Sequence, residues 1–314
     1  MTTLGWLLVM VIGAVAIVWG AERFAEHLAE ASARLGLSAF ALALLLAGAE
    51  PEELATVITA SARGVDGVAF GDVIGANAAI VTVALGVGAV VTVMPFGKRI
   101  RRYALGGLLT AVLAGPIVWD GNVGRIEGIL LASGYVAFLT WIWRAERQPP
   151  ALGETGELDE HAGHTGPVGR ELVLVLVGLV ALTAGSIALV EAVRRISQVE
   201  ETQTRLGLVI VGFATAFELV VLAWSAGRRG ITEAVVAGVV GSYAYNLTMS
   251  LGVGALVAPI TISDAGTIRA PFVAMAGLLA GVVAVAARRN QLTRGTGWAL
   301  VAAYPVFVVV ALVA

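Results

Sequence analysis

The chain has no cysteine and little charge. Without cysteine it can form neither disulfides nor thiolate metal sites. Charged residues make up only 13% of its 314 residues, about half the share of a typical soluble domain. Apolar residues make up 58% and occur in long runs, and the mean hydropathy is +0.90. This composition predicts an all-α, multi-pass integral membrane protein that contacts the lipid bilayer.

Charged clusters separate the apolar runs, and taking them as the ends of membrane spans predicts ten spans. They cover approximately residues 4–20, 37–62, 67–95, 103–119, 126–143, 172–190, 206–227, 231–259, 270–287 and 297–313. The one long polar segment, 144–170, contains two prolines and an acidic patch, as flexible linkers do. It divides the chain into two halves of five spans, residues 1–143 and 171–314.

The distribution of Lys and Arg predicts the orientation of these spans. Alternate loops contain 14 of the 20 basic residues, and the other loops contain the remaining six. Because loops rich in Lys and Arg stay in the cytoplasm, both termini are expected on the extracytoplasmic side of a cell membrane. All 20 basic residues are assigned to loops, so none is expected within a span.

The two halves resemble each other in sequence. The segment L-G-V-G-A recurs unchanged at 85–89 and 251–255, an offset of 166, and Glu53-Leu54 matches Glu218-Leu219 at an offset of 165. An odd number of spans in each half requires the second half to enter the membrane with the opposite orientation. This predicts the inverted-repeat architecture of secondary transporters, whose binding site lies between the repeats.

The second span contains three glutamates and a proline in the segment L-A-G-A-E-P-E-E-L, residues 46–54. A charged side chain near the bilayer centre is unfavourable by roughly 2.5–3.5 kcal/mol, so these acids require a partner. With no basic residue expected in a span, that partner is a mobile cation or a proton. Glu50 and Glu53 are three residues apart and are expected to share a helical face, with Glu52 pointing away from it.

Other oxygen ligands are expected close to Glu50 and Glu53. Pro51 cannot donate a helical hydrogen bond, which frees backbone carbonyls of the preceding turn as ligands. Carboxylate, carbonyl and hydroxyl oxygens together suit Ca²⁺, Na⁺ or another hard cation. The residues expected to provide them, besides Glu50 and Glu53, are Ala47, Gly48, Asn77, Glu218, Ser242 and Asn246.

Two pairs of motifs resemble the alpha-repeats of the calcium/cation antiporter superfamily, which includes sodium/calcium exchangers. The pairs are G-A-E-P-E-E-L (48–54) with G-D-V-I-G-A-N (71–77), and F-A-T-A-F-E-L (213–219) with A-G-V-V-G-S-Y (237–243). The resemblance covers essentially the whole chain and implies ten spans in two inverted repeats. By position it implies that Glu53 and Glu218 are the two key metal-binding glutamates, and that Thr215, Ser242 and Asn246 are further site residues.

The chain departs from the family pattern, which is approximately G-T-S-L-P-E-L followed by G-N-V-V-G-S-N-I-F-N. Ala49, Ala76, Ala214 and Ile80 remove side-chain oxygens, and Glu50 replaces a hydroxyl. Sodium sites depend on those hydroxyls, so their loss disfavours Na⁺ coupling. A carboxylate pair crowded in a low dielectric can exchange protons near neutral pH, which makes H⁺ coupling an alternative.

The resemblance implies a secondary active antiporter that exchanges Ca²⁺ for Na⁺ or H⁺ by alternating access. It implies no enzymatic activity, no cofactor besides the transported cations, and no nucleic-acid partner. The absence of a nucleotide-binding loop argues against a primary pump. Two alternatives stay open: a monovalent cation/proton antiporter that uses only the acids, and a non-transporting paralogue with a structural or regulatory role.

Two further features of the sequence allow both a functional and a purely structural interpretation. Asp72 could guide ions toward the site or could simply occupy a turn. His161 and His164 in the acidic linker permit a metal site, although a solvated loop is the simpler interpretation of their spacing.

Overall fold

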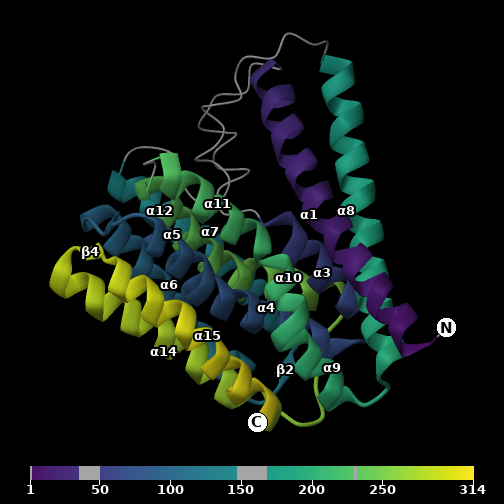
Figure 1. The fold of residues 1–314 in the computed structure, drawn as a ribbon. Helices are drawn as coiled ribbons and strands as arrows, with labels where there is room; N and C mark the ends of the chain where they lie inside the picture. The colour runs from purple at the N-terminus through teal and green to yellow at the C-terminus, as the bar shows by residue number, and fades with distance from the viewer. Residues whose placement is uncertain (1, 35–49, 147–167, 230–231) are drawn as a thin grey trace.

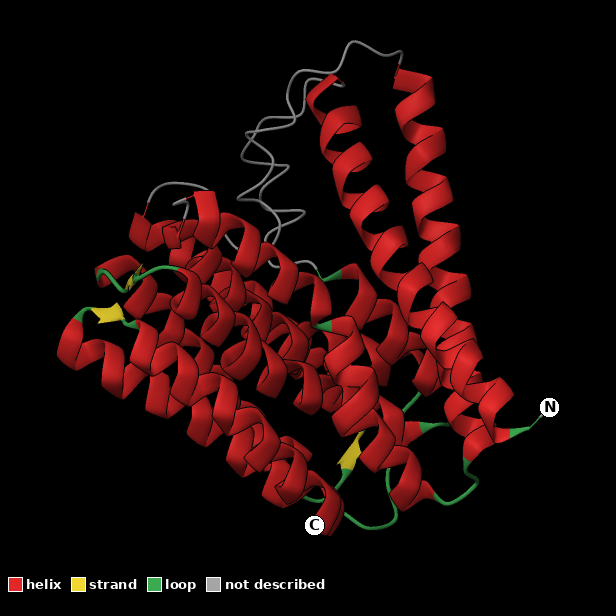
Figure 2. Ribbon diagram, viewed as in Figure 1, coloured by secondary structure: helices red, strands yellow, loops and turns green. Residues whose placement is uncertain are grey.

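The structure, a computed structural model, describes residues 2–34, 50–146, 168–229 and 232–314. In these ranges the chain is almost entirely helical, with short strands only at connections (Figure 2). Apolar runs form helices in a bilayer because every backbone polar group must be satisfied within the segment.

The elements of the first half include one π-helical segment, η1, between two α-helices. In order they are α1 (Thr3–Arg34), α3 (Pro51–Ala62), α4 (Asp66–Ala79), η1 (Ile80–Ala84), α5 (Leu85–Val91), β1 (Met94–Pro95), α6 (Lys98–Val118), β2 (Asn122–Val123) and α7 (Arg125–Glu146).

The elements of the second half include two π-helical segments, η3 and η4. They are α8 (Val168–Ile196), α9 (Glu200–Leu206), η3 (Gly207–Val211), α10 (Gly212–Thr215), α11 (Phe217–Arg229), α12 (Thr232–Tyr245), η4 (Asn246–Ser250), α13 (Leu251–Val257), β3 (Ile260–Thr261), α14 (Gly266–Arg289), β4 (Gln291–Leu292) and α15 (Arg294–Val313).

Seven helices of the described residues are long and apolar enough to cross a membrane. They cover Thr3–Leu28, Asp66–Val91, Arg125–Arg144, Val168–Ile196, Glu200–Arg229, Gly266–Arg289 and Arg294–Val313. Each matches one of the ten expected spans. The other three expected spans fare differently. Two of them are largely helical: 103–119 corresponds to α6, and 231–259 corresponds to α12–η4–α13. Much of the third, 37–62, lies outside the described residues. Large apolar side chains are exposed along the outer helices, as on a lipid-facing surface.

The two halves share an unusual helix pattern. In each, an α-helix leads into five π-helical residues and then into a further α-helix; η1 begins at Ile80 and η4 at Asn246, the same offset of 166 as the L-G-V-G-A repeat. Two-residue antiparallel ladders also join the halves reciprocally. Strand β1 of the first half pairs with β4, and its counterpart β3 pairs with β2.

The rod α4–η1–α5 occupies the centre of the molecule, and α1 and α8 lie side by side at one edge and extend beyond the other helices (Figure 1). The central rod packs very closely on η3. A Cβ atom at Gly75 would lie 2.1 Å from the carbonyl oxygen of Leu208, so only glycine permits this approach. Small residues at such contacts are how membrane helices bring their backbones together.

Candidate functional site

Helix α3 begins at Pro51, directly after Glu50. Glu50 is the N-cap, with non-helical φ and ψ of −104° and 86°. Proline is well suited to the first helical position, where its missing N–H would have had no helical acceptor. Glu52 and Glu53 lie in the first turn, where the positive end of the helix dipole stabilises carboxylates. Pro51 therefore starts a helix here, and the acids lie at its N-terminus.

Three carboxylates converge at this helix start. One ligand oxygen from each of Glu50, Glu52 and Glu53 lies within 4.8 Å of the other two. The three side chains are at most 1% exposed. The expectation that Glu52 points away from the cluster is wrong. It assumed that Glu50 lies on the same helix, but Glu50 precedes α3, so helical periodicity does not set its direction.

The second half contains a matching break. Helix α10 ends at Thr215 and α11 begins at Phe217, so the break falls on Ala216, 165 residues after Pro51. Glu218, the second residue of α11, is partly exposed and is near enough to Glu52 for their charges to interact. Thr215 occupies the position that corresponds to Glu50.

The long helices of both halves complete the site. The Ser242 hydroxyl, on α12, donates to Oε1 of Glu50. Asn246, the first residue of η4, has its Nδ2 3.4 Å from Oε1 of Glu53 and 3.3 Å from Oδ1 of Asn77. Asn77 in turn donates to the backbone carbonyl of Tyr243 at 3.1 Å. The structure thus brings Glu50, Glu53, Asn77, Ser242 and Asn246 together, across the contact between the halves.

Asp72 belongs to the same buried region, which the sequence did not predict. It is fully buried in the middle of α4 rather than at a turn. Its Oδ1 accepts a hydrogen bond from the Thr215 hydroxyl at 2.8 Å, and its charge is near enough to interact with that of Glu53. An acid six residues inside the apolar run 67–95 was itself a sequence signal, because acids within spans mark functional positions.

Several buried oxygens of the site have no hydrogen-bond partner among the described residues. They are Oε2 of Glu52, Oε2 of Glu53, Oδ2 of Asp72 and Oδ1 of Asn246. No ion pair identified among the described residues connects these acids to Lys or Arg. A buried set of carboxylate and amide oxygens without a basic partner is suited to a hard cation or to protons. The expected carbonyl ligands Ala47 and Gly48 lie outside the described residues.

The sequence of the chain is similar to those of known membrane proteins. The sequence profile of the sodium/calcium exchanger protein family matches residues 5–144 and again 170–313. A putative antiporter, CaxA, of Alkalimonas amylolytica is 26% identical over 278 residues, which cover 86% of each chain. The inner membrane protein YrbG of Escherichia coli K12 is 23% identical over 259 residues, which cover 80% of this chain and 79% of that one.

Solved structures share the fold. The sodium-calcium exchanger NCX_Mj, soaked with 100 mM Na⁺ and 10 mM Sr²⁺, aligns with a TM-score of 0.63 and 20% identity over 98% of this chain and 99% of that one. The same exchanger soaked without Na⁺ and Ca²⁺ aligns with a TM-score of 0.59 and 19% identity, covering 97% of this chain and 98% of that one. Because the family profile matches both halves and together most of the chain, the protein belongs to the sodium/calcium exchanger protein family.

Proposed function

We propose that this protein is a secondary active cation antiporter that exchanges Ca²⁺ for Na⁺ or H⁺ by alternating access. The observation that carries the proposal is the convergence of the Glu50, Glu52 and Glu53 carboxylates, buried at the contact between the halves. Family membership supports the same conclusion.

Charge explains why such a site would exchange ions. Three ionised carboxylates buried together are strongly unfavourable unless positive charge accompanies them. One Ca²⁺ supplies two charges, and protons or Na⁺ supply them when Ca²⁺ leaves. Because both kinds of cation use the same oxygens, their binding is mutually exclusive. A transporter that changes conformation only when this charge is neutralised moves one kind of cation in exchange for the other.

The proposed ligands come from both halves. Ca²⁺ takes about six to eight oxygens at about 2.3–2.6 Å. In our proposal Glu53 is the central ligand, Glu50 and Glu52 supply further carboxylate oxygens from the first half, and Glu218 approaches from the second half. Neutral oxygens come from the residues in contact with Glu50 and Glu53, which are Asn77, Ser242 and Asn246.

Thr215 has a different role in this proposal from the one that the family resemblance implies. Its hydroxyl points to Asp72, at 2.8 Å, and both side chains are buried. We assign Thr215 to holding Asp72 in place beside Glu53. The carbonyls of Ala47 and Gly48 remain predicted ligands.

The small number of hydroxyl groups in the site bears on which counter-ion it binds. Of the site positions described, only Thr215 and Ser242 carry a hydroxyl, and both donate it to a carboxylate. This acid-rich site favours H⁺ over Na⁺ as the counter-ion. The same observation favours a second candidate function, exchange of a monovalent cation for protons without Ca²⁺.

We further propose ten spans in two inverted five-helix repeats, with both termini on the extracytoplasmic side of the plasma membrane. The reciprocal strand ladders and the matching π-helical segments support the repeat. Because the chain has no cysteine, single cysteines introduced at Arg99 and Arg269 are unique labels. An impermeant maleimide should label them from opposite sides of the membrane; labelling from the same side would contradict the topology.

The function is tested with purified protein in proteoliposomes, with Ca²⁺, Na⁺ and H⁺ gradients imposed one at a time. An imposed H⁺ or Na⁺ gradient should drive Ca²⁺ uptake, and Glu53→Gln should abolish it. Glu201→Gln is the matched control, because Glu201 is exposed and paired with Arg205 on α9; it should retain uptake.

Each other outcome has a definite meaning. Unchanged Ca²⁺ exchange in Glu53→Gln would overturn the site assignment. Exchange of Na⁺ for H⁺ without Ca²⁺ movement would establish the second candidate. No cation flux under any gradient would support a non-transporting paralogue.

A further inference from the structure

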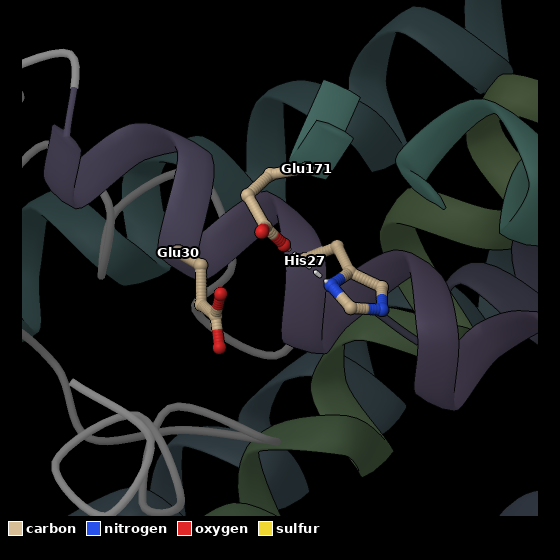
Figure 3. Close-up of side chains that lie close together, drawn as sticks. All are labelled: His27, Glu30 and Glu171. Carbon is tan, nitrogen blue, oxygen red and sulfur yellow. Dashed lines mark hydrogen bonds and ion pairs between the residues drawn. The ribbon is translucent and has the colours of Figure 1, made fainter. Parts of the chain in front are cut away.

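A second cluster of metal-ligating side chains lies between α1 and α8, on elements that do not form the site described above. His27 and Glu30 come from α1, and Glu171 comes from the first turn of α8 (Figure 3). One ligand atom from each lies within 4.8 Å of the other two. The exposed fractions are 8%, 8% and 3%, so these three polar side chains are buried together.

The helices are held together closely enough to build such a cluster. His27 and Glu30 are three residues apart and therefore share one face of α1. A Cβ atom at Gly20 would lie 2.5 Å from the backbone nitrogen of Leu182, so the two backbones are nearly in contact about two turns from His27 and three turns from Glu171. The imidazole Nδ1 of His27 lies 2.8 Å from Oε2 of Glu171, which joins α1 to α8 directly.

We propose that His27, Glu30 and Glu171 form a second cation site, which binds a divalent first-row transition metal such as Zn²⁺. One imidazole and two carboxylates are a ligand set that suits Zn²⁺, with a fourth position left for water. The hard-oxygen cluster at Glu50–Glu53 has no imidazole, so the two sites select different metals. A neutral imidazole and two carboxylates together balance the charge of a 2+ ion.

The distances between the three side chains become those of a zinc site after a small adjustment. Two ligand atoms at about 2.0–2.2 Å from Zn²⁺ with tetrahedral geometry lie about 3.4 Å apart. The 2.8 Å contact between His27 and Glu171 has to open by roughly half an ångström, and Glu30 has to stay within reach. We expect changes of side-chain torsion to make this adjustment while the close-packed helices keep their positions.

One of the three proposed ligands, His27, borders a cavity of about 290 Å³, which is large enough for water. Arg23 and Arg170 line the same cavity; the guanidinium of Arg23 is 3.1 Å from the carboxylate of Glu26, which offsets its charge. Through this cavity a hydrated ion can approach the imidazole, and a water molecule can supply the fourth ligand.

The site would act on the helix pair rather than on the transported cation. Its ligands come from two helices, so a bound ion links α1 to α8 near one end of both. The site does not depend on the proposed transport activity, and the two can be tested separately.

The test uses the full-length protein, purified in detergent and stripped of metal. Titration with ZnCl₂ followed by calorimetry, with metal content measured after dialysis, should give one bound ion per chain. His27→Gln and Glu171→Gln should each weaken binding at least about tenfold, because altering even groups that only orient metal ligands costs about that much. Glu22→Gln, an exposed acid on the same helix, is the matched control and should bind normally.

Two further variants guard against effects on folding. Glu171→His supplies another zinc ligand at the same place and should retain Zn²⁺ binding. Glu53→Gln changes only the other acidic site, so it should also retain Zn²⁺ binding. Co²⁺ bound in place of Zn²⁺ should show visible absorption of a four-coordinate complex that is lost in His27→Gln.

Three results would overturn the proposal. The unmodified protein binds no Zn²⁺, Glu22→Gln and His27→Gln lose the same amount of Zn²⁺ affinity, or His27→Gln binds Zn²⁺ as tightly as the unmodified protein. Any of these results would assign the cluster to a hydrogen bond that only holds α1 against α8.

Discussion

The contact between Thr215 and Asp72 gives a prediction that can be worked through from the structure. The Thr215 hydroxyl is 2.8 Å from Oδ1 of Asp72, closer than its other acceptors, the carbonyl oxygens of Val211 at 3.2 Å and Gly212 at 3.3 Å. Asp72 is fully buried, and its Oδ2 has no hydrogen-bond partner among the described residues. Thr215→Val keeps the shape of the side chain and removes the donor.

The expected cost follows from the burial of the acceptor. Leaving a buried acceptor without its donor costs about 1–3 kcal/mol. Thr215→Val should therefore lower the free energy of unfolding by about 1–3 kcal/mol. At about 2–4 °C for each kcal/mol, the apparent unfolding temperature should fall by about 2–12 °C.

Tryptophan fluorescence during heating in detergent measures this change, since the chain contains seven tryptophans. The matched control is Thr82→Val. Thr82 is also fully buried, but within the described part of the chain its hydroxyl donates only to the carbonyl of Ala78 in the preceding turn. Because that carbonyl lies within the helix, the control should lose less than about 1 kcal/mol. Thr215→Ser keeps the hydroxyl and should restore most of the stability.

A double-mutant cycle identifies the partner. Thr215→Val should cost much less in an Asp72→Ala background, which removes the acceptor, giving a coupling free energy of about 0.5–3 kcal/mol. Equal shifts for Thr215→Val and Thr82→Val, or zero coupling with Asp72→Ala, would refute the reasoning that Thr215 acts through Asp72.

Two other substitutions test the packing and composition of the site. Glu52→Gln removes one of the three converging carboxylates and should weaken Ca²⁺-driven exchange in proteoliposomes, whereas Glu201→Gln on α9 should not; equal activities would place Glu52 outside the binding machinery. Gly75→Ala puts a Cβ 2.1 Å from the Leu208 carbonyl and should lower the free energy of unfolding by about 1–3 kcal/mol. Its control is Gly134→Ala, where no atom lies within 4 Å and a gain of about 0.5–1 kcal/mol is expected; loss of stability in both would point to a general intolerance of alanine in these helices.

Much of the fold was predictable because it depends on local composition. Long apolar runs can only be helices in a bilayer, and seven of the ten expected spans coincide with helices that can cross a membrane. The recurrence of L-G-V-G-A predicted a repeat, and the described residues contain matching π-helical segments directly before it. The motifs around Glu53 and Glu218 were sufficient to suggest the family that the sequence profile then matched.

Part of the site was predictable for a related reason. Acids in apolar runs are rare enough to be noticed singly, so Glu50 and Glu53 were identified without any knowledge of their neighbours. The glycine-rich eighth span was expected to bring Ser242 and Asn246 close to these acids, and hydrogen bonds join Ser242 to Glu50 and Asn246 to Glu53. The inward direction of Glu52 was missed because the helix starts at Pro51, and no periodicity rule applies across that start.

What the sequence determined by itself is the membrane environment, the repeat, the family resemblance and the presence of buried acids. Only the tertiary structure showed that Asp72 faces Thr215 across 143 residues, and that His27 and Glu30 face Glu171 across a similar distance in the chain. Those pairings depend on how closely the backbones approach at positions such as Gly75 and Gly20. A glycine in the sequence permits close approach but does not say which helix fills the space, because that choice is made by packing all the helices at once.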